Sequence, residues 1–161
     1  MNRLGLKHLE FSGLQMKTII KALLLLIGLS AVPVFAQSDF ESTKARAEAG
    51  DAQAQWSLGE MYDTGEGVVQ DDVEAAKWHR LAAEQGNANS QFILGATYKD
   101  GEGVAQNYQE AVKWYRLAAE QGDALAQFFL GAMYGDGRGV TQSYAKAYVV
   151  LIFVITLTSE Y

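Results

Sequence analysis

The sequence contains no cysteine, a single proline and few basic side chains, and each shortage excludes a class of structure. Without cysteine there is no disulfide framework, no thiolate metal site and no thiol nucleophile. Thirteen basic residues are outnumbered by nineteen acidic ones, and the net charge of −6 provides no basic surface for nucleic acid. One proline beside sixteen glycines indicates helices that are joined by glycine-containing turns.

The N-terminal region has the pattern of a signal peptide. Lys17 and Lys21 precede fifteen uncharged residues, 22–36, which end in the small-residue sequence Val-Phe-Ala. We therefore predict that residues 1–36 are an N-terminal extension and signal peptide, cleaved after Ala36, and that the protein is exported to a bacterial periplasm or secreted. A membrane-spanning helix is the alternative, but such a helix needs about 20 apolar residues and this run has fifteen, interrupted by Pro33. We therefore expect no stable membrane span after cleavage.

The remainder, residues 37–161, is predicted to be one domain built from repeats. Written one above the other, residues 50–85 and 86–121 agree at 21 of 36 positions without a gap. A third block, 122–157, stays in register through Ala147 and then diverges, whereas 37–49 resembles the end of a block and is interpreted as a leading half-repeat. Sequence identity at a fixed period is typical of repeat proteins.

Each block is predicted to contain two helices joined by a Gly-x-Gly-Val loop. The first helix would begin after a capping Asp or Asn, and the second after a capping Asp, Asn or Ser, because these side chains accept hydrogen bonds from unpaired first-turn N–H groups. The capping positions are Asp51, Asn87 and Asp123 for the first helices, and Asp71, Asn107 and Ser143 for the second. Glu74 and Glu110 follow three residues after two of these caps, the spacing of a capping box.

The residues that recur between blocks fall on one face of each first helix. At 100° per residue, Gln55, Leu58, Gly59 and Tyr62 lie within about 100° of one another, so this face is expected to contact the neighbouring helix. A helix-interior glycine costs about 1 kcal/mol relative to alanine, and its recurrence in each block suggests the close approach of a second backbone. Such a small helical pair cannot bury its apolar face alone, so the blocks are expected to stack.

The first two blocks contain four motifs in the same order: Leu-Gly-x-x-Tyr, Gly-x-Gly-Val, Ala-x-x-Trp and a closing Leu-Ala-Ala-Glu-Gln-Gly. Together these motifs resemble the Sel-1-like repeat family. The resemblance covers residues 40 to about 148. It implies an all-α fold, an α/α superhelix or solenoid of helix-turn-helix repeats, which acts as an adaptor surface for other proteins. The family pattern stops after Tyr148, where VVLIFVITLT replaces the sequence KWYRLAAEQG of the preceding block.

No catalytic, cofactor or metal site is predicted. Ser143 and Lys146 have the Ser-x-x-Lys spacing of penicillin-recognising enzymes, but Ser143 stands where the other blocks have helix caps. His79 is replaced by Tyr115 in the next block, which favours a packed or half-exposed histidine over a ligand or base. The protein is therefore interpreted as non-catalytic; the alternative is an envelope hydrolase of the β-lactamase type, an activity proposed for some cysteine-rich relatives.

A protein or peptide partner is expected on the concave side of the solenoid, which first helices line in repeats of this kind. The positions that vary between blocks lie opposite the recurring face and become more apolar toward the C-terminus. Contiguous exposed apolar side chains usually mark interaction sites. The residues predicted to bind the partner are Ile93, Thr97, Leu125, Phe129 and Met133.

The apolar run from Val149 to Leu157 has three possible origins. The first is a membrane anchor, but the run is about half as long as a membrane span. The second is a helix that docks a partner or a second copy of the chain. The third, which we favour, is an altered reading frame. Seven contiguous apolar residues without charge are expected to promote self-association of the chain.

Overall fold

The computed structural model describes residues 34–150, which belong to one compact unit. The signal-peptide residues before Val34 and the apolar residues after Val150 lie outside the described part. Cleavage after Ala36, export and self-association through Val149 to Leu157 therefore stay predictions. The division into residues 1–36, a half-repeat 37–49 and a solenoid likewise stays a prediction.

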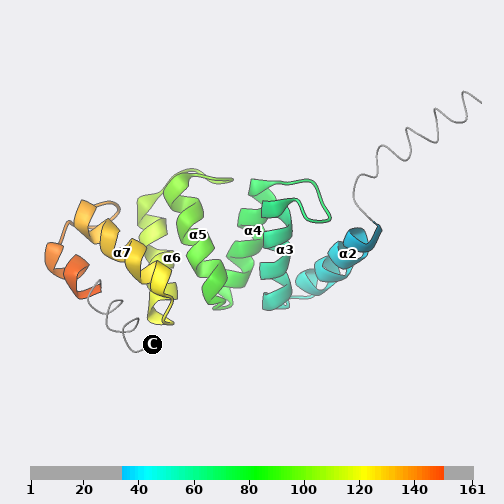
Figure 1. Ribbon diagram of the computed structural model, residues 1–161, viewed down its shortest axis with the longest axis horizontal. Coiled ribbons are helices and arrows are strands. Elements are labelled where there is room, and N and C mark those ends of the chain that lie inside the picture. The colour runs from blue at the N-terminus through cyan, green and yellow to red at the C-terminus, as the bar shows by residue number, and fades with distance from the viewer. Residues whose placement is uncertain (1–33, 151–161) are drawn as a thin grey trace, which may run out of the picture. The chain divides into compact units, whose positions relative to one another are not determined.

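All the regular structure among the described residues is α-helical, as predicted. Each helix packs against the next one along the chain, and α5 also contacts α7 (Figure 1). This is the sequential packing of a solenoid, in which contacts stay between neighbours. The helices are α2 (Val34–Glu48), α3 (Ala52–Thr64), α4 (Asp72–Glu84), α5 (Ala88–Asp100), α6 (Tyr108–Glu120) and α7 (Ala124–Asp136), and residues 144–150 are also helical.

The predicted helix starts are confirmed by the capping hydrogen bonds. The Asp51 carboxylate accepts from the N–H of Ala54 at 3.0 Å, and that hydrogen bond together with Arg46 lowers the pKa of Asp51. The same bond recurs at the start of α5 and α7. Only half of the predicted capping box is confirmed. The Asp71 carboxylate accepts from the N–H of Glu74 at 3.1 Å, but the Glu74 carboxylate pairs with Lys77 and the N–H of Asp71 donates to the carbonyl of Tyr62 instead.

Ser143 also serves as a helix cap, in agreement with the sequence analysis. Its Oγ accepts from the N–H of Lys146 at 3.3 Å. The N–H of Ser143 donates to the carbonyl of Tyr134, as the N–H of Asn107 does to the carbonyl of Tyr98. The Ser-x-x-Lys spacing is therefore explained by helix capping in the third repeat.

A buried glutamine in each first helix ties its repeat to the preceding one. The side-chain amides of Gln55, Gln91 and Gln127 each donate to a carbonyl near the end of the preceding helix, at 3.1–3.2 Å. In the first two repeats the glutamine oxygen accepts in turn from the amide that ends the second helix, Gln85 or Gln121, at 2.7 Å. These bonds satisfy polar groups that burial would otherwise leave unpaired.

The recurring glycine of the first helices is needed for close packing, as predicted, but its neighbour differs from the prediction. A Cβ at Gly59 would lie 2.6 Å from the ring of His79, and one at Gly95 would lie 2.6 Å from the ring of Tyr115. The expectation of a second backbone at this point is therefore wrong in the first two repeats. At Gly131 the carbonyl of Ala147 does approach, at 3.5 Å.

Candidate protein-interaction surface

Four of the five predicted partner-binding residues reach the surface of α5 and α7. Leu125 is 59% exposed, and Ile93, Thr97 and Phe129 are half-buried. Met133 is only 3% exposed and belongs to the core that contains Leu130 and Tyr115. Its prediction as a surface residue is therefore wrong, because the helix turns this position toward the core.

Phe129 lies at the boundary between the core and this surface. Its ring stacks on that of Tyr115, with centroids 5.5 Å apart and planes 12° apart. The ring centroids of Phe92 and Phe129 lie 6.0 Å apart, and the Lys99 ammonium lies 5.6 Å from the Phe129 centroid. Burial raises the pKa of the Tyr115 hydroxyl above its ordinary value. Phe129 is thus partly a packing residue rather than the freely exposed side chain that the sequence suggested.

Sequence analysis missed the aromatic position immediately before Ile93 and Phe129. Phe128 is 49% exposed beside Phe129, with ring centroids 5.6 Å apart. Phe92, at the same place in the preceding repeat, is partly buried. An aromatic residue occupies this position in every repeat, since the first repeat has Trp56. This recurrence is the sequence signal from which the position could have been found.

A cavity of about 260 Å³ lies between the first and second repeats, and we call it the inter-repeat cavity. It combines apolar side chains of α5 with carboxylates from α3, from the start of α4 and from the loop after α5. Two predicted partner-binding residues, Ile93 and Thr97, are among those that line it. The full lining is Asp63, Gln70, Asp72, Phe92, Ile93, Ala96, Thr97 and Glu102.

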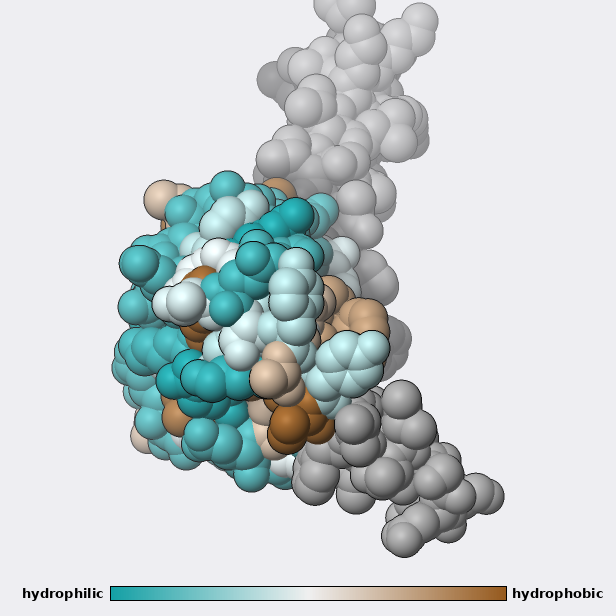
Figure 2. All heavy atoms as spheres, turned by 90° about the vertical axis from the view of Figure 1, so that its left-hand side faces the viewer, coloured by the Kyte–Doolittle hydropathy of each residue, from teal (hydrophilic) through white to brown (hydrophobic). Residues whose placement is uncertain are grey.

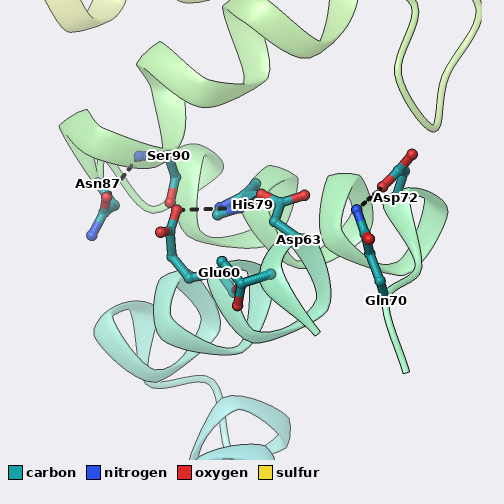
Figure 3. Close-up of polar contacts among 8 residues, drawn as sticks. Glu60, Asp63, Gln70, Asp72, His79, Asn87 and Ser90 are labelled. Atoms are coloured by element: carbon teal, nitrogen blue, oxygen red, sulfur yellow. Dashed lines mark hydrogen bonds and ion pairs between the residues drawn. The ribbon is translucent and has the colours of Figure 1, made fainter. Parts of the chain in front are cut away.

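Asp63 is positioned at this cavity by a histidine from α4. The Nε2 atom of His79 lies 2.9 Å from Oδ2 of Asp63 and 3.9 Å from Oε1 of Glu60 (Figure 3). His79 is only 1% exposed, so the packed interpretation is confirmed and the half-exposed one is not. In the next repeat His79, Asp63 and Glu60 are replaced by Tyr115, Lys99 and Ala96. This polar cluster therefore occurs once among the three repeats.

Glu60, Asp63 and His79 are also the described residues that come closest to a metal-ligand set. Their ligand atoms all lie within 4.8 Å of one another. A metal-binding histidine normally donates its other ring N–H to an acceptor that orients the ring. The Nδ1 atom of His79 is buried without a partner among the described residues. The contact between His79 and Asp63 explains the cluster.

A larger apolar groove, of about 790 Å³, lies beside the last described helical residues. Its lining includes Leu130, Tyr134, Val149 and Val150. Val150 stands where Trp78 and Trp114 fill the earlier repeats. Figure 2 looks onto this end of the repeats and shows a small group of apolar residues in a largely hydrophilic face. Nothing among the described residues covers the groove, and the chain continues from it into residues 151–161.

Comparison with known proteins identifies this repeat. The Sel1 repeat matches residues 52–87, 88–123 and 124–149. A protective antigen of uropathogenic Escherichia coli strains is 40% identical with a TM-score of 0.70, over 73% of this chain and 25% of that protein. A Sel1 repeat protein of Oxalobacter formigenes is 39% identical with a TM-score of 0.72, over 74% of this chain and 49% of that protein.

More distant similarity extends to cysteine-rich protein B of Helicobacter pylori. It is 19% identical with a TM-score of 0.59, over 76% of this chain and 90% of that protein, which shows a common fold. The chain spans only a quarter and about half of the two closer proteins described above. No curated protein matches it. Within the described part of the chain, none of the helices combines the length and apolar character needed to cross a membrane.

Proposed function

Because the chain belongs to the Sel1 repeat family, we propose that it is an exported, non-catalytic scaffold that binds a protein or peptide on the first helices of its repeats. Sel1 repeat proteins generally serve as protein-interaction scaffolds and are generally non-catalytic. The proposed binding surface consists of Ile93, Thr97, Leu125 and Phe129, extended by Phe128. Met133 is left out because it is buried.

One observation carries the proposal: Leu125 and Phe128 expose 59% and 49% of their surface on the same helix, next to the partly buried Phe129. Such side chains gain free energy when a partner removes them from water, at about 25 cal/mol per Å² of apolar surface. Adjacent exposed apolar residues are typical of interaction sites. The family relationship supports a protein or peptide as the partner of this surface.

Binding is tested with the mature chain, residues 37–161, immobilised against a display library of random twelve-residue peptides. We expect selected peptides to bind the wild type and to bind Leu125→Asp at least about tenfold more weakly, since apolar anchors dominate such interfaces. Val69→Asp is the matched control, because Val69 is 83% exposed and lies outside the surface. Equal binding to both variants would remove Leu125 from the proposed surface.

The export part of the proposal rests on Lys17, Lys21 and the apolar residues that follow them. Mass spectrometry of the exported protein is expected to find its N-terminus at Gln37. Protein retained in the cytoplasm with an intact N-terminus would contradict export.

The hydrolase alternative has a separate test. A chromogenic β-lactam is incubated with the wild type and with Ser143→Ala. We expect no turnover above the uncatalysed rate, since the Ser143 Oγ atom caps a helix. Turnover that is lost in Ser143→Ala would overturn the non-catalytic assignment.

A further inference from the structure

The inter-repeat cavity is acidic on one side and apolar on the other. Asp63, Asp72 and Glu102 contribute carboxylates, and no lysine or arginine is among the residues that line it. One oxygen of Asp63 is engaged by His79, while the Asp72 carboxylate accepts a hydrogen bond of 3.4 Å from the Gln70 amide and has no salt bridge within the described residues. Glu102 has no salt bridge within the described residues. The cavity therefore holds negative charge that no described cation neutralises.

The next repeat carries the opposite charge at two of the three positions and a neutral tyrosine at the third. Lys99 corresponds to Asp63, Tyr108 to Asp72 and Arg138 to Glu102. The Lys99 ammonium lies 5.6 Å from the ring centroid of Phe129, and the Arg138 guanidinium 5.8 Å from that of Tyr108. There the cations are held against aromatic rings of the protein itself. The acidic character thus belongs to the first cavity and is not imposed by the fold.

The backbone geometry is nevertheless the same in both places. A Cβ at Gly103, whose φ is +66°, would overlap the carbonyl of Asp72, and one at Gly139, whose φ is +70°, would overlap that of Tyr108. These glycines let each loop rest on the start of the preceding second helix. Glu102 is thereby fixed beside Asp72, and Arg138 beside Tyr108. Exchanging the side chains between the two places is therefore compatible with the fold.

The apolar side of the cavity suits the stem of a long cationic side chain. Phe92, Ile93 and Ala96 offer hydrocarbon surface next to the three carboxylates. Lysine and arginine bury their methylene groups against such surface while their charged ends remain with polar partners. A volume of about 260 Å³ is below the roughly 300–1,000 Å³ typical of sites for whole small molecules, and it suits one side chain of a longer ligand.

We propose that the inter-repeat cavity binds a lysine or arginine side chain of the partner peptide. This inference rests on the proposed function, because it specifies which residue that partner presents beside the apolar surface of α7. Asp72 pairs with the cation from the start of α4 and Glu102 from the loop after α5. Asp63 completes the acidic side, and His79 is a positioning residue that orients Asp63 from α4. The adjoining Ile93 and Phe92 contact the aliphatic stem.

The test uses three twelve-residue display libraries that differ only in one fixed central residue: arginine, glutamate or leucine. Each is selected on the mature wild-type chain at low and at high salt. We expect the arginine library to give the tightest binders, with affinity that falls as salt rises, because the cavity is open to solvent and its charges are screened. An Asp72→Tyr/Glu102→Arg variant, which copies the second repeat, should bind these peptides at least about tenfold more weakly.

Glu66→Arg is the matched control. Glu66 occupies the same loop position in the first repeat, is exposed, and does not line the cavity. It reverses one charge, as Glu102→Arg does, and should leave affinity within about twofold of the wild type. Circular dichroism of both variants checks that the repeats still fold.

Two outcomes would overturn the inference, and they differ from failure of the proposed function. If peptides bind but show no preference for arginine, or if the double variant keeps its affinity, then the cavity does not take a cationic side chain while the interaction surface stands. If Glu66→Arg weakens binding as much as the double variant, the effect comes from net charge and the cavity assignment fails. If none of the three libraries gives a binder, both the inference and the proposed function fail.

Discussion

At Gly95, the absence of a Cβ atom allows the two helices of the second repeat to pack closely. An added Cβ would lie 2.6 Å from Cδ1 of the Tyr115 ring, which is fully buried and has little room to move. We expect Gly95→Ala to lower the free energy of unfolding by about 1–3 kcal/mol through overpacking. Thermal or urea unfolding followed by circular dichroism measures the change.

Gly135→Ala is the control for this prediction. Gly135 lies inside α7, and an added Cβ would be 3.8 Å from Ala147, an ordinary contact distance. Here alanine should increase stability by about 0.5–1 kcal/mol, because it lowers the entropy of the unfolded chain and favours helix. Equal changes in unfolding free energy at the two positions would contradict the role assigned to close packing at Gly95.

Phe129 and Leu125 should separate packing from binding. Phe129→Ala removes a ring that stacks on Tyr115 and contacts Phe92, so we expect a loss of about 2 kcal/mol in unfolding free energy, less than for a fully buried phenylalanine. Leu125→Ala, at a position 59% exposed, should change it by less than about 0.5 kcal/mol. Denaturant titration of both variants is the measurement, and a large loss for Leu125→Ala would contradict the assigned helix face.

The two helices within each of the first two repeats are joined by glutamine hydrogen bonds as well as by apolar packing. Gln121 donates to Oε1 of Gln91 at 2.7 Å and to the carbonyl of Gly86 at 3.1 Å. Gln121→Leu would leave the Gln91 oxygen unpaired, so we expect a loss of about 1–3 kcal/mol in the free energy of unfolding. Gln109→Leu on the exposed face of the same helix is the control and should have little effect. Similar losses for both would mean that these bonds contribute no net stability.

The third repeat already carries the change that this variant would introduce. Leu157 stands at the position of Gln85 and Gln121. The Oε1 atom of Gln127 is buried without a hydrogen-bond partner among the residues that the structure describes, and residue 157 lies outside them.

At the scale of the whole molecule, the apolar groove beside Val150 lies at the C-terminal end of the described repeats. Replacing residues 149–157 by KWYRLAAEQ, the sequence of 113–121, would restore the tryptophan and the terminal glutamine of a complete repeat. We expect Tm to rise by at least about 4 °C, since filling the groove and pairing Gln127 should each add stability. An unchanged or lower Tm would show that the native apolar residues already complete the packing.

Self-association is a second prediction at this scale. The uncharged run from Val149 has high β-propensity and follows an open groove. Light scattering should therefore find larger species for the chain that ends at Tyr161 than for one that ends at Tyr148. A full-length chain that is monomeric at high concentration and at least as stable as the shortened one would contradict this prediction.

Sequence alone determined the period, the helix starts and the buried face of the repeats. These features are local: a side-chain oxygen at Asp51 or Asn87 caps the N–H groups nearest to it, and recurrence of Leu58 and Gly59 at a fixed period reflects one packing solution used again. Helix boundaries and fold class follow from them without knowledge of distant contacts.

Only the tertiary structure decided how each surface position is used. Met133 and Phe129 share a helix stripe with Leu125, but Met133 is buried in the core and Phe129 is half-covered by the Tyr115 ring of α6. The inter-repeat cavity joins Asp63 to Glu102, residues separated by two helices and two loops. Angular position on one helix cannot reveal such a site, because exposure and charge there depend on side chains that arrive from the neighbouring repeat.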